Sequence, residues 1–149
     1  GGKKMKIAIG SDHGGFHLKA EMVKWLREKQ IEVIDLGAQN LDSIDYPDVA
    51  QAVAEEVLLE RADKGILICG TGIGISIAAN KIDGIRAALC HDVYSAQKSR
   101  EHNDANILAM GERVIGFGHA LLIVEEWLKA KFEGGRHSRR VEKIAGLEK

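Results

Sequence analysis

Short apolar runs alternate with amphipathic stretches along almost the whole chain. Residues 6–10 form the first apolar run, which is typical of a buried strand. Leu18, Met22 and Leu26 then recur at helical spacing and predict a helix with one apolar face. The same alternation continues along the chain without a linker, an internal repeat or a shift in composition. It predicts a single domain built from successive strand–helix units.

The expected elements follow this alternation. Strands are expected at residues 6–10, 32–36, 65–69, 85–90 and 107–110, with 113–115 continuing the last strand beyond an interruption at Gly111. Helices are expected around 18–26, from Pro47 to 58, and at 74–82, 91–102 and 118–131, and a short amphipathic helix begins at Arg136. Units of this length imply an open parallel sheet with helices on both faces. The predicted fold is therefore an α/β three-layer sandwich with a five-stranded parallel sheet and a C-terminal helical arm.

Composition narrows the class of protein. The 149 residues carry 21 basic and 22 acidic side chains, and this balance argues against a general nucleic-acid binder. No apolar run approaches the roughly 20 residues of a membrane helix. Two cysteines make no disulfide framework, so we expect free thiols and a cytoplasmic protein. Residues 1–4 are interpreted as a cloning remnant ahead of a native start at Met5, and residues 5–149 as the domain.

A cysteine and a glycine-rich turn follow the apolar run at 65–69. The turn consists of Gly70, Thr71, Gly72, Ile73 and Gly74, directly after Cys69. A strand, such a turn and a helix together bind anions, because unpaired N–H groups and the helix dipole both favour negative charge. A helix N-terminus also favours a thiolate, so Cys69 could act as a general base beside an oxyanion hole. The alternatives are that Cys69 is a small buried apolar residue and that the glycines bind a phosphate.

A dinucleotide-binding fingerprint is the other function that such a turn suggests. That fingerprint requires G-x-G-x-x-G, whereas this chain has G-x-G-x-G with the bulky Ile75 in place of the third glycine. The glycines also follow the third predicted strand instead of the first. These departures argue against a nicotinamide or flavin cofactor.

The carboxyl ends of parallel strands meet at one rim of a sheet, where ligands bind. This rule places Asp12 and His13, the turn after Cys69, and the pair His91 and Asp92 on one rim. Asp12 could instead cap the following helix, because aspartate is a favoured N-cap residue. His13 and His17 stand four residues apart but lack a third ligand at a suitable spacing, so we expect His17 on a solvated helix face.

Two polar segments in the second half of the chain are also candidates. His102 and Asn103 end the fourth predicted helix, where a histidine could serve only the helix dipole. Arginines in the C-terminal helix share one face and follow a glycine pair that suggests a hinge. Such a face is either solvated or suited to binding a phosphate, and Arg113 is a further candidate anchor.

Six motifs in this order resemble the type B ribose-5-phosphate isomerases. The resemblance runs from Met5 nearly to the C-terminus, and the family also includes galactose 6-phosphate and allose 6-phosphate isomerases. The motifs are SDHGG at 11–15, DYP at 45–47, CGTGIGISIAANK at 69–81, GIRAA at 84–88, SREHN at 99–103 and EGGRH at 133–137.

This resemblance implies a Rossmann-like sheet and a homodimer, sometimes paired into a tetramer, with active sites at the subunit interface. It implies neither a metal nor an organic cofactor, neither nucleic acid nor membrane as a partner, and a sugar phosphate as substrate. The implied reaction is reversible conversion of D-ribose 5-phosphate to D-ribulose 5-phosphate, in the non-oxidative pentose phosphate pathway. A six-carbon sugar phosphate substrate, or a non-catalytic nucleotide-binding module, is the alternative.

The resemblance also assigns roles by matching position. Cys69 is the base that moves the proton between C1 and C2, the backbone of residues 70–74 holds the enediolate, and Thr71 lies nearby. His102 assists ring opening, and the other implied contacts are to the sugar or its phosphate. These contacts come from Asp12, His13, Tyr46, Asn103, Arg113, Arg136 and Arg140. Some members carry a glutamate near the cysteine position, but this chain has Cys69 and Ile75 and is similar to the cysteine-using branch.

Overall fold

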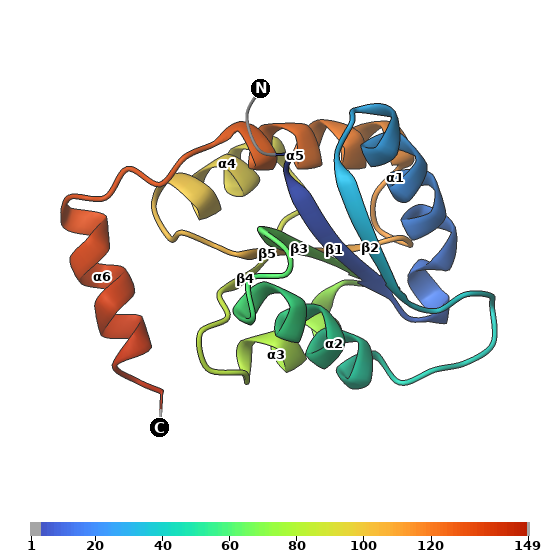
Figure 1. Cartoon of the computed structure of the whole chain (residues 1–149), viewed down its shortest axis with the longest axis horizontal. Helices are drawn as coiled ribbons and strands as arrows, with labels where there is room; N and C mark the ends of the chain where they lie inside the picture. The colour runs from blue at the N-terminus through green and yellow to red at the C-terminus, as the bar shows by residue number, and fades with distance from the viewer. Residues whose placement is uncertain (1–3, 149) are drawn as a thin grey trace.

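The computed structural model describes residues 4–148, so all but one residue of the expected cloning remnant lies outside the described part. Five parallel strands form one sheet in the order β2-β1-β3-β5-β4 (Figure 1). The strands are β1 (Lys6–Ser11), β2 (Glu32–Gly37), β3 (Lys64–Cys69), β4 (Ala87–Leu89) and β5 (Ile107–Gly111). The predicted five-stranded parallel sheet is confirmed.

Helices cover both faces of this sheet. They are α1 (Phe16–Glu28), α2 (Tyr46–Leu58), α3 (Ile73–Asn80), α4 (Val93–Glu101), α5 (Phe117–Lys129) and α6 (Arg136–Ala145), with a 3-10 turn at His13–Gly15. One apolar cluster joins α1, α4 and α5 to the sheet and includes Met22 and Trp127. The second joins α2 and α3 to the opposite face and includes Val53 and Ile75. The predicted three-layer sandwich is therefore confirmed, and within residues 4–148 no helix has the length and apolar character needed to cross a membrane.

Two predicted strands, at 85–90 and at 107–115, are shorter in the structure than predicted. β4 spans only Ala87–Leu89. Just before it the side chain of Asn106 accepts the Arg86 N–H, and the amide of Asn80 bonds both backbone groups of Ala87 on the open edge. The predicted continuation at 113–115 is a turn. The N–H groups of Val114 and Ile115 both donate to Gly111 O, so the backbone folds back at the end of β5.

The strand order fixes where a ligand can bind. β1 lies between β2 and β3 in the sheet. The chain runs from β1 to β2 on one side and then crosses to β3 on the other side. Such a switch point leaves a crevice at the carboxyl ends of the two strands. Asp12 follows β1 and Cys69 ends β3, so both candidate residues lie at this crevice.

The C-terminal arm α6 stands apart from the sheet at one end of the molecule (Figure 1). It follows Gly134 and Gly135, whose positive φ values of 70° and 56° favour glycine at the predicted hinge. The segment after α6 touches the body of the domain through Glu148, whose Oε1 accepts the Gly84 N–H at 2.9 Å. The apolar side of the arm stays open, and Ile144 is 44% exposed.

Candidate active site

The turn after β1 packs tightly against β3. Asp12 is buried, and its Oδ1 accepts the Gly14 N–H at 2.9 Å, so the capping alternative for this residue is confirmed for the 3-10 turn. A Cβ placed on Gly15 would lie 2.6 Å from the Ile68 carbonyl oxygen. Glycine is therefore required here for the turn to bring Asp12 beside the end of β3.

His13 has a defined hydrogen-bonding partner in the polar loop before α2. The Ile44 N–H donates to its Nδ1 atom at 3.3 Å. An imidazole that accepts at Nδ1 carries its proton at Nε2 when it is neutral. His13 thus has an Nε2–H donor left for a ligand, while His17 is exposed on α1 as expected.

The turn after Cys69 is organised around the sulfur. The Gly72 N–H donates to Cys69 Sγ at 3.1 Å, and Gly72 has a left-handed φ of 80° that this approach requires. The Ile73 N–H donates to Thr71 Oγ1 at 3.2 Å. Two of the N–H groups assigned to the oxyanion hole are therefore engaged within the turn. Gly74 lies in the first turn of α3, where N–H groups have no intrahelical partner, and is a candidate donor to an oxyanion.

Two more predicted residues border this turn. The Arg113 N–H donates to Gly70 O at 3.0 Å, and a Cβ on Gly70 would lie 3.2 Å from Arg113 Nη1. A Cβ on Gly74 would lie 2.7 Å from Tyr46 Cζ, so the aromatic ring rests against the glycine backbone. The structure thus gathers a first group of predicted residues at the carboxyl ends of the strands, which we call the carboxyl-edge group: Asp12, His13, Tyr46, Arg113 and residues 69–74.

His91 and Asp92, which the pattern placed on the same rim, serve the scaffold. The Gly111 N–H donates to His91 Nε2 at 2.9 Å, and burial lowers the pKa of this imidazole below its ordinary value of 6.5. Asp92 Oδ1 accepts the Ser95 N–H at 2.6 Å and caps α4. The neutral His91 side chain therefore holds the end of β5 beside Cys69.

The other predicted residues lie elsewhere. His102 is the C-cap residue of α4, and its ring stacks on that of His137 with centroids 4.1 Å apart. Glu133 Oε1 lies 3.6 Å from the Nε2 atom of each histidine. Burial and the neighbouring His102 lower the pKa of His137, which favours its neutral form at pH 7. Sequence reasoning gave His137 and Glu133 no role, although their spacing of four residues was a signal.

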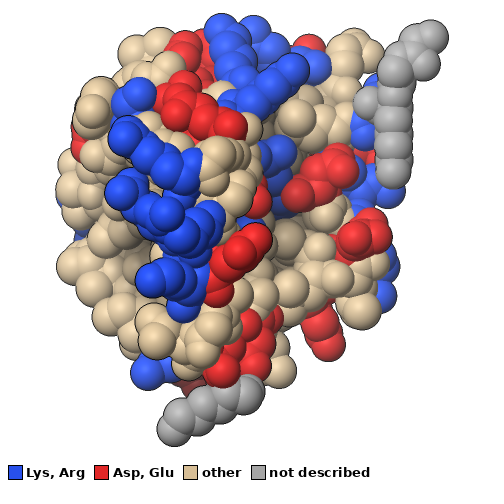
Figure 2. All heavy atoms as spheres, turned by 90° about the vertical axis from the view of Figure 1, so that its left-hand side faces the viewer, with Lys and Arg blue, Asp and Glu red and all other residues tan. Residues whose placement is uncertain are grey.

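The arginines of the arm accompany His102. Arg136 and Arg140 are exposed on α6, the helix that also carries His137 and Arg139. Figure 2 shows Lys and Arg side chains gathered on this face of the molecule. Asn103 is exposed beside His102, so these four predicted residues form a second group.

The two groups lie at opposite ends of the strands: the carboxyl-edge group at the carboxyl ends and the second group at the amino ends. β5 begins four residues after Asn103, with Ile107 beside Gly65, and it ends with Gly111 beside Cys69. Four steps along a strand separate these ends by roughly 13 Å. One chain therefore does not bring His102 to Cys69.

His102, Glu133 and His137 offer ligand atoms within 4.8 Å of one another and could hold a metal ion on that criterion. A metal bound to imidazole lies in the plane of the ring. The two ring planes here are parallel within 9° and stacked, so their lone pairs do not converge on one point. Metal binding would require at least one ring to rotate.

Comparison with known proteins places this geometry in a family. Residues 7–144 match the model of the Ribose/Galactose Isomerase family. The chain belongs to this family. It is 56% identical over 143 residues to ribose-5-phosphate isomerase B of Escherichia coli (strain K12), with 96% of both chains covered. It is 57% identical over 145 residues to a putative sugar phosphate isomerase of Bacillus subtilis (strain 168), with 97% of both covered.

Solved structures from the same family agree with the fold. The ribose-5-phosphate isomerase B of Clostridium thermocellum superposes with a TM-score of 0.95 at 59% identity, covering 96% of this chain and 97% of that one. The ribose 5-phosphate isomerase of Thermotoga maritima gives a TM-score of 0.95 at 49% identity, covering 97% and 100%. The resemblance drawn from the motifs is confirmed.

Membership of this isomerase family indicates which chemical groups the Cys69 turn would need to supply. Isomerisation of an aldose needs a base at the reacting carbons and donors for the oxyanion that forms. Cys69 has the sole ionisable side chain among residues 69–75. Ile75, at the position near which some family members carry a glutamate, is apolar and fully buried. The turn therefore offers one base and backbone donors within a few residues.

Proposed function

We propose that this chain interconverts D-ribose 5-phosphate and D-ribulose 5-phosphate through an enediolate, as an aldose–ketose isomerase of the non-oxidative pentose phosphate pathway. The observation that carries the proposal is the contact between the Gly72 N–H and Cys69 Sγ at the start of α3. This contact holds the Cys69 sulfur in place next to backbone N–H groups that can donate to an oxyanion. The names of the curated relatives support the five-carbon substrate over a six-carbon one.

The chemistry follows from the carboxyl-edge group. Cys69 removes the proton from C2 of the open-chain aldose and returns it to C1, while the proton of the C2 hydroxyl passes to O1 and leaves O2 as the ketone oxygen. The negative charge develops on the sugar oxygens and meets the Gly74 N–H and the Thr71 hydroxyl. Asp12 and Tyr46 contact sugar hydroxyls. His13, through its Nε2–H, and Arg113 bind the phosphate, whose binding energy orients the reacting carbons.

The second group completes the site from another copy of the chain. We assign His102 to ring opening, Asn103 to the sugar, and Arg136 and Arg140 to the phosphate. These residues lie at the far edge of the sheet from Cys69. A homodimer in which each chain lends its arm to its partner supplies all the required groups to each site.

Open apolar surface supports the same assembly. A cavity of about 700 Å³ lies between the arm and the edge of the sheet at β4. Ile144 and Leu147 line it, and Leu147 is 81% exposed. A second copy would cover this apolar surface, as isologous dimers do. A pair of such dimers would make the tetramer, and a cytoplasmic location fits the two free cysteines.

Turnover of three substrates tests the reaction. Ribose 5-phosphate, allose 6-phosphate and galactose 6-phosphate are compared with the wild-type chain, Cys69→Ala and the matched control Cys90→Ala. We expect conversion of the five-carbon substrate, loss in Cys69→Ala and retention in Cys90→Ala. A faster six-carbon reaction, or undiminished turnover in Cys69→Ala, would refute the proposal. Nucleotide binding with no turnover of any sugar phosphate would favour a binding module.

Complementation tests the shared site. Cys69→Ala and His102→Ala are each expected to be inactive on the closed-ring substrate. Mixing and refolding them forms heterodimers with one intact site, and random pairing restores about one quarter of wild-type activity. No recovery, despite exchange of subunits seen by mass, would contradict a site built from two chains.

A further inference from the structure

The residue that follows His102 and Asn103 has an unusual backbone conformation. Asp104 has a φ of 49°, in the left-handed region that L residues rarely adopt. Aspartate visits this region more readily than most residues, but only as a single residue with local support. The turn that carries the second candidate group is therefore held in place by its surroundings.

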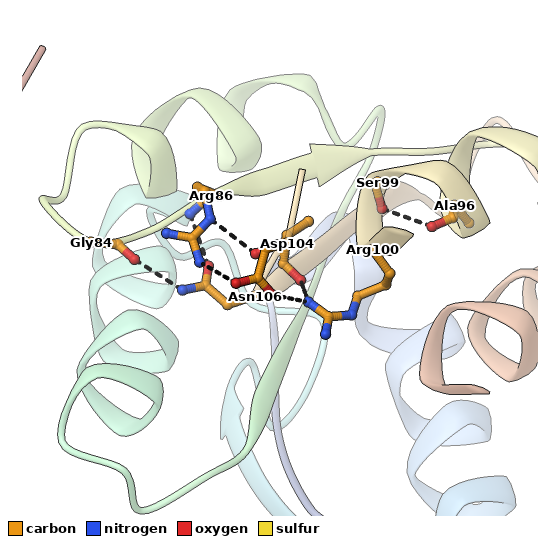
Figure 3. Close-up of polar contacts among 8 residues, drawn as sticks. Gly84, Arg86, Ala96, Ser99, Arg100, Asp104 and Asn106 are labelled. Carbon is orange, nitrogen blue, oxygen red and sulfur yellow. Dashed lines mark hydrogen bonds and ion pairs between the residues drawn. The ribbon is translucent and has the colours of Figure 1, made fainter. Parts of the chain in front are cut away.

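Two arginines supply that support (Figure 3). Arg100 Nη1 donates to Asp104 Oδ1 at 2.9 Å, and Arg86 Nη2 lies 3.5 Å from Asp104 Oδ2. Arg86 Nε also donates to the Asp104 carbonyl oxygen at 2.9 Å. The carboxylate and the backbone of one residue are thus bound at the same time. We call Arg86, Asp104 and Arg100 the clamp.

The clamp continues into the elements on both sides. Arg100 Nη1 donates to Ala105 O at 2.7 Å, and its guanidinium is buried 6.0 Å from the centroid of a ring of Trp127. The Asn106 side chain accepts the Arg86 N–H and donates to Gly84 O. Backbone and side chains from α4, the start of β4 and the start of β5 therefore meet at one turn.

The clamp lies next to His102 in the chain, and this position suggests a role beyond stability. Exposed ion pairs contribute little to stability. Here one partner is buried, and both pairs converge on the residue two positions after His102. The His102 ring stacks on His137 and its Nε2 lies 3.6 Å from Glu133 Oε1, and its backbone leads directly into the turn that the clamp holds.

We propose that Asp104, bound by Arg86 and Arg100, is a positioning residue that sets His102 and Asn103 for ring opening. The inference rests on the proposed function, in which His102 acts on the closed sugar ring of the substrate. A misplacement of about 1 Å in a catalytic group can lower a rate roughly a hundredfold. The clamp prevents such a shift without touching the substrate.

The chemistry of the two sugars separates ring opening from proton transfer. D-Ribose 5-phosphate exists mainly as a furanose, which must open before reaction. D-Ribulose 5-phosphate cannot close a furanose ring, because its O5 carries the phosphate. Exchange of its C1 hydrogen with solvent deuterium therefore reports proton transfer at Cys69 alone.

Three variants make the test. Asp104→Asn removes the charge but keeps the size and the tolerance of a left-handed backbone. Asp104→Gly keeps the backbone conformation and the contact of Arg86 Nε with the carbonyl oxygen of residue 104, but it removes both arginine contacts to the carboxylate. Asp63→Asn is the matched control, because its carboxylate lies just before β3 at the amino ends of the strands and accepts the Lys6 N–H instead of binding an arginine of the clamp. If Asp104→Asn does not fold, Arg86→Lys, which loses the Nε contact, takes its place.

We expect conversion of ribose 5-phosphate to fall about ten- to hundredfold in both Asp104 variants, while deuterium exchange into ribulose 5-phosphate stays within about twofold. Asp63→Asn should change neither rate. A parallel loss of both rates in the Asp104 variants, or normal conversion by Asp104→Gly, would overturn the clamp. A wild-type chain that shows neither reaction would instead refute the proposed function, which separates the two failures.

Discussion

Lys19 is a buried cation whose removal has a calculable effect. Its side chain is 2% exposed, and its Nζ lies 2.7 Å from Asp35 Oδ1. The same Nζ donates to the carbonyl oxygens of Leu36 at 2.8 Å and Ala38 at 2.6 Å. All three ammonium hydrogens are therefore used, and they bind α1 to the end of β2 and the start of the following loop.

Lys19→Met keeps most of the length and the apolar stem of the side chain but removes these three contacts. A hydrogen bond to a charged group contributes about 1.5–3 kcal/mol, and breaking a buried ion pair costs roughly 3–5 kcal/mol. Asp35 keeps one third of its side chain exposed and regains water, so the separate contributions do not simply add. We expect a loss of about 4 kcal/mol in the free energy of unfolding, or roughly 10 °C in Tm.

The assay is urea unfolding of wild type, Lys19→Met and the control Lys24→Met, with the m-value held as a check on two-state behaviour. Lys24 is exposed on the same helix, so its replacement should change stability by less than about 0.5 kcal/mol. The loop that Lys19 anchors also carries Ile44, which orients His13, so KM for the sugar phosphate should rise. Equal stability of the two variants would refute the role assigned to Lys19.

Three other changes test separate parts of the site. Gly74→Ala puts a Cβ 2.7 Å from Tyr46 Cζ, so steady-state kinetics should show KM raised about tenfold, and an unchanged KM would contradict this packing. Burial lowers the pKa of His91 in the fold, so its stabilising effect is complete above pH 6.5 and is lost on acidification. In His91→Gln the urea midpoint should therefore change less with pH than in wild type between about pH 5 and 7. Midpoints that depend on pH equally in both proteins would disprove this role. Burial raises the pKa of Cys90 to about 11, so mass spectrometry should find it unalkylated by iodoacetamide at neutral pH, and rapid labelling would contradict that environment.

Much of the carboxyl-edge group was predictable, because short-range rules place it. An apolar run ending in Cys69 predicts a strand end, and a glycine turn before a helix predicts backbone donors there. The same rule placed Asp12 beside it, since neighbouring parallel strands end together. The capping role of Asp12 and its place in the crevice are compatible, which the sequence left as alternatives.

Contacts between distant segments were not predictable. Glu112 Oε1 accepts the Leu18 N–H at 2.6 Å and caps α1 from 94 positions away. His91 binds the end of β5, and the Asn106 side chain accepts the Arg86 N–H just before the first residue of β4. Such contacts depend on which segments become neighbours, and periodicity along the chain carries no information about that.

The sequence by itself determined the kinds of elements, their order and the chemical groups at the ends of the strands, because hydrophobic period and turn chemistry are local properties. Only the tertiary structure decided that the candidate residues divide into two groups. Helix α4 runs antiparallel to the strands, so His102 at its C-terminus lies at the amino ends of the strands, whereas Cys69 lies at their carboxyl ends. The separation follows from the direction of the chain in space, and it is the reason that the proposed site needs two chains.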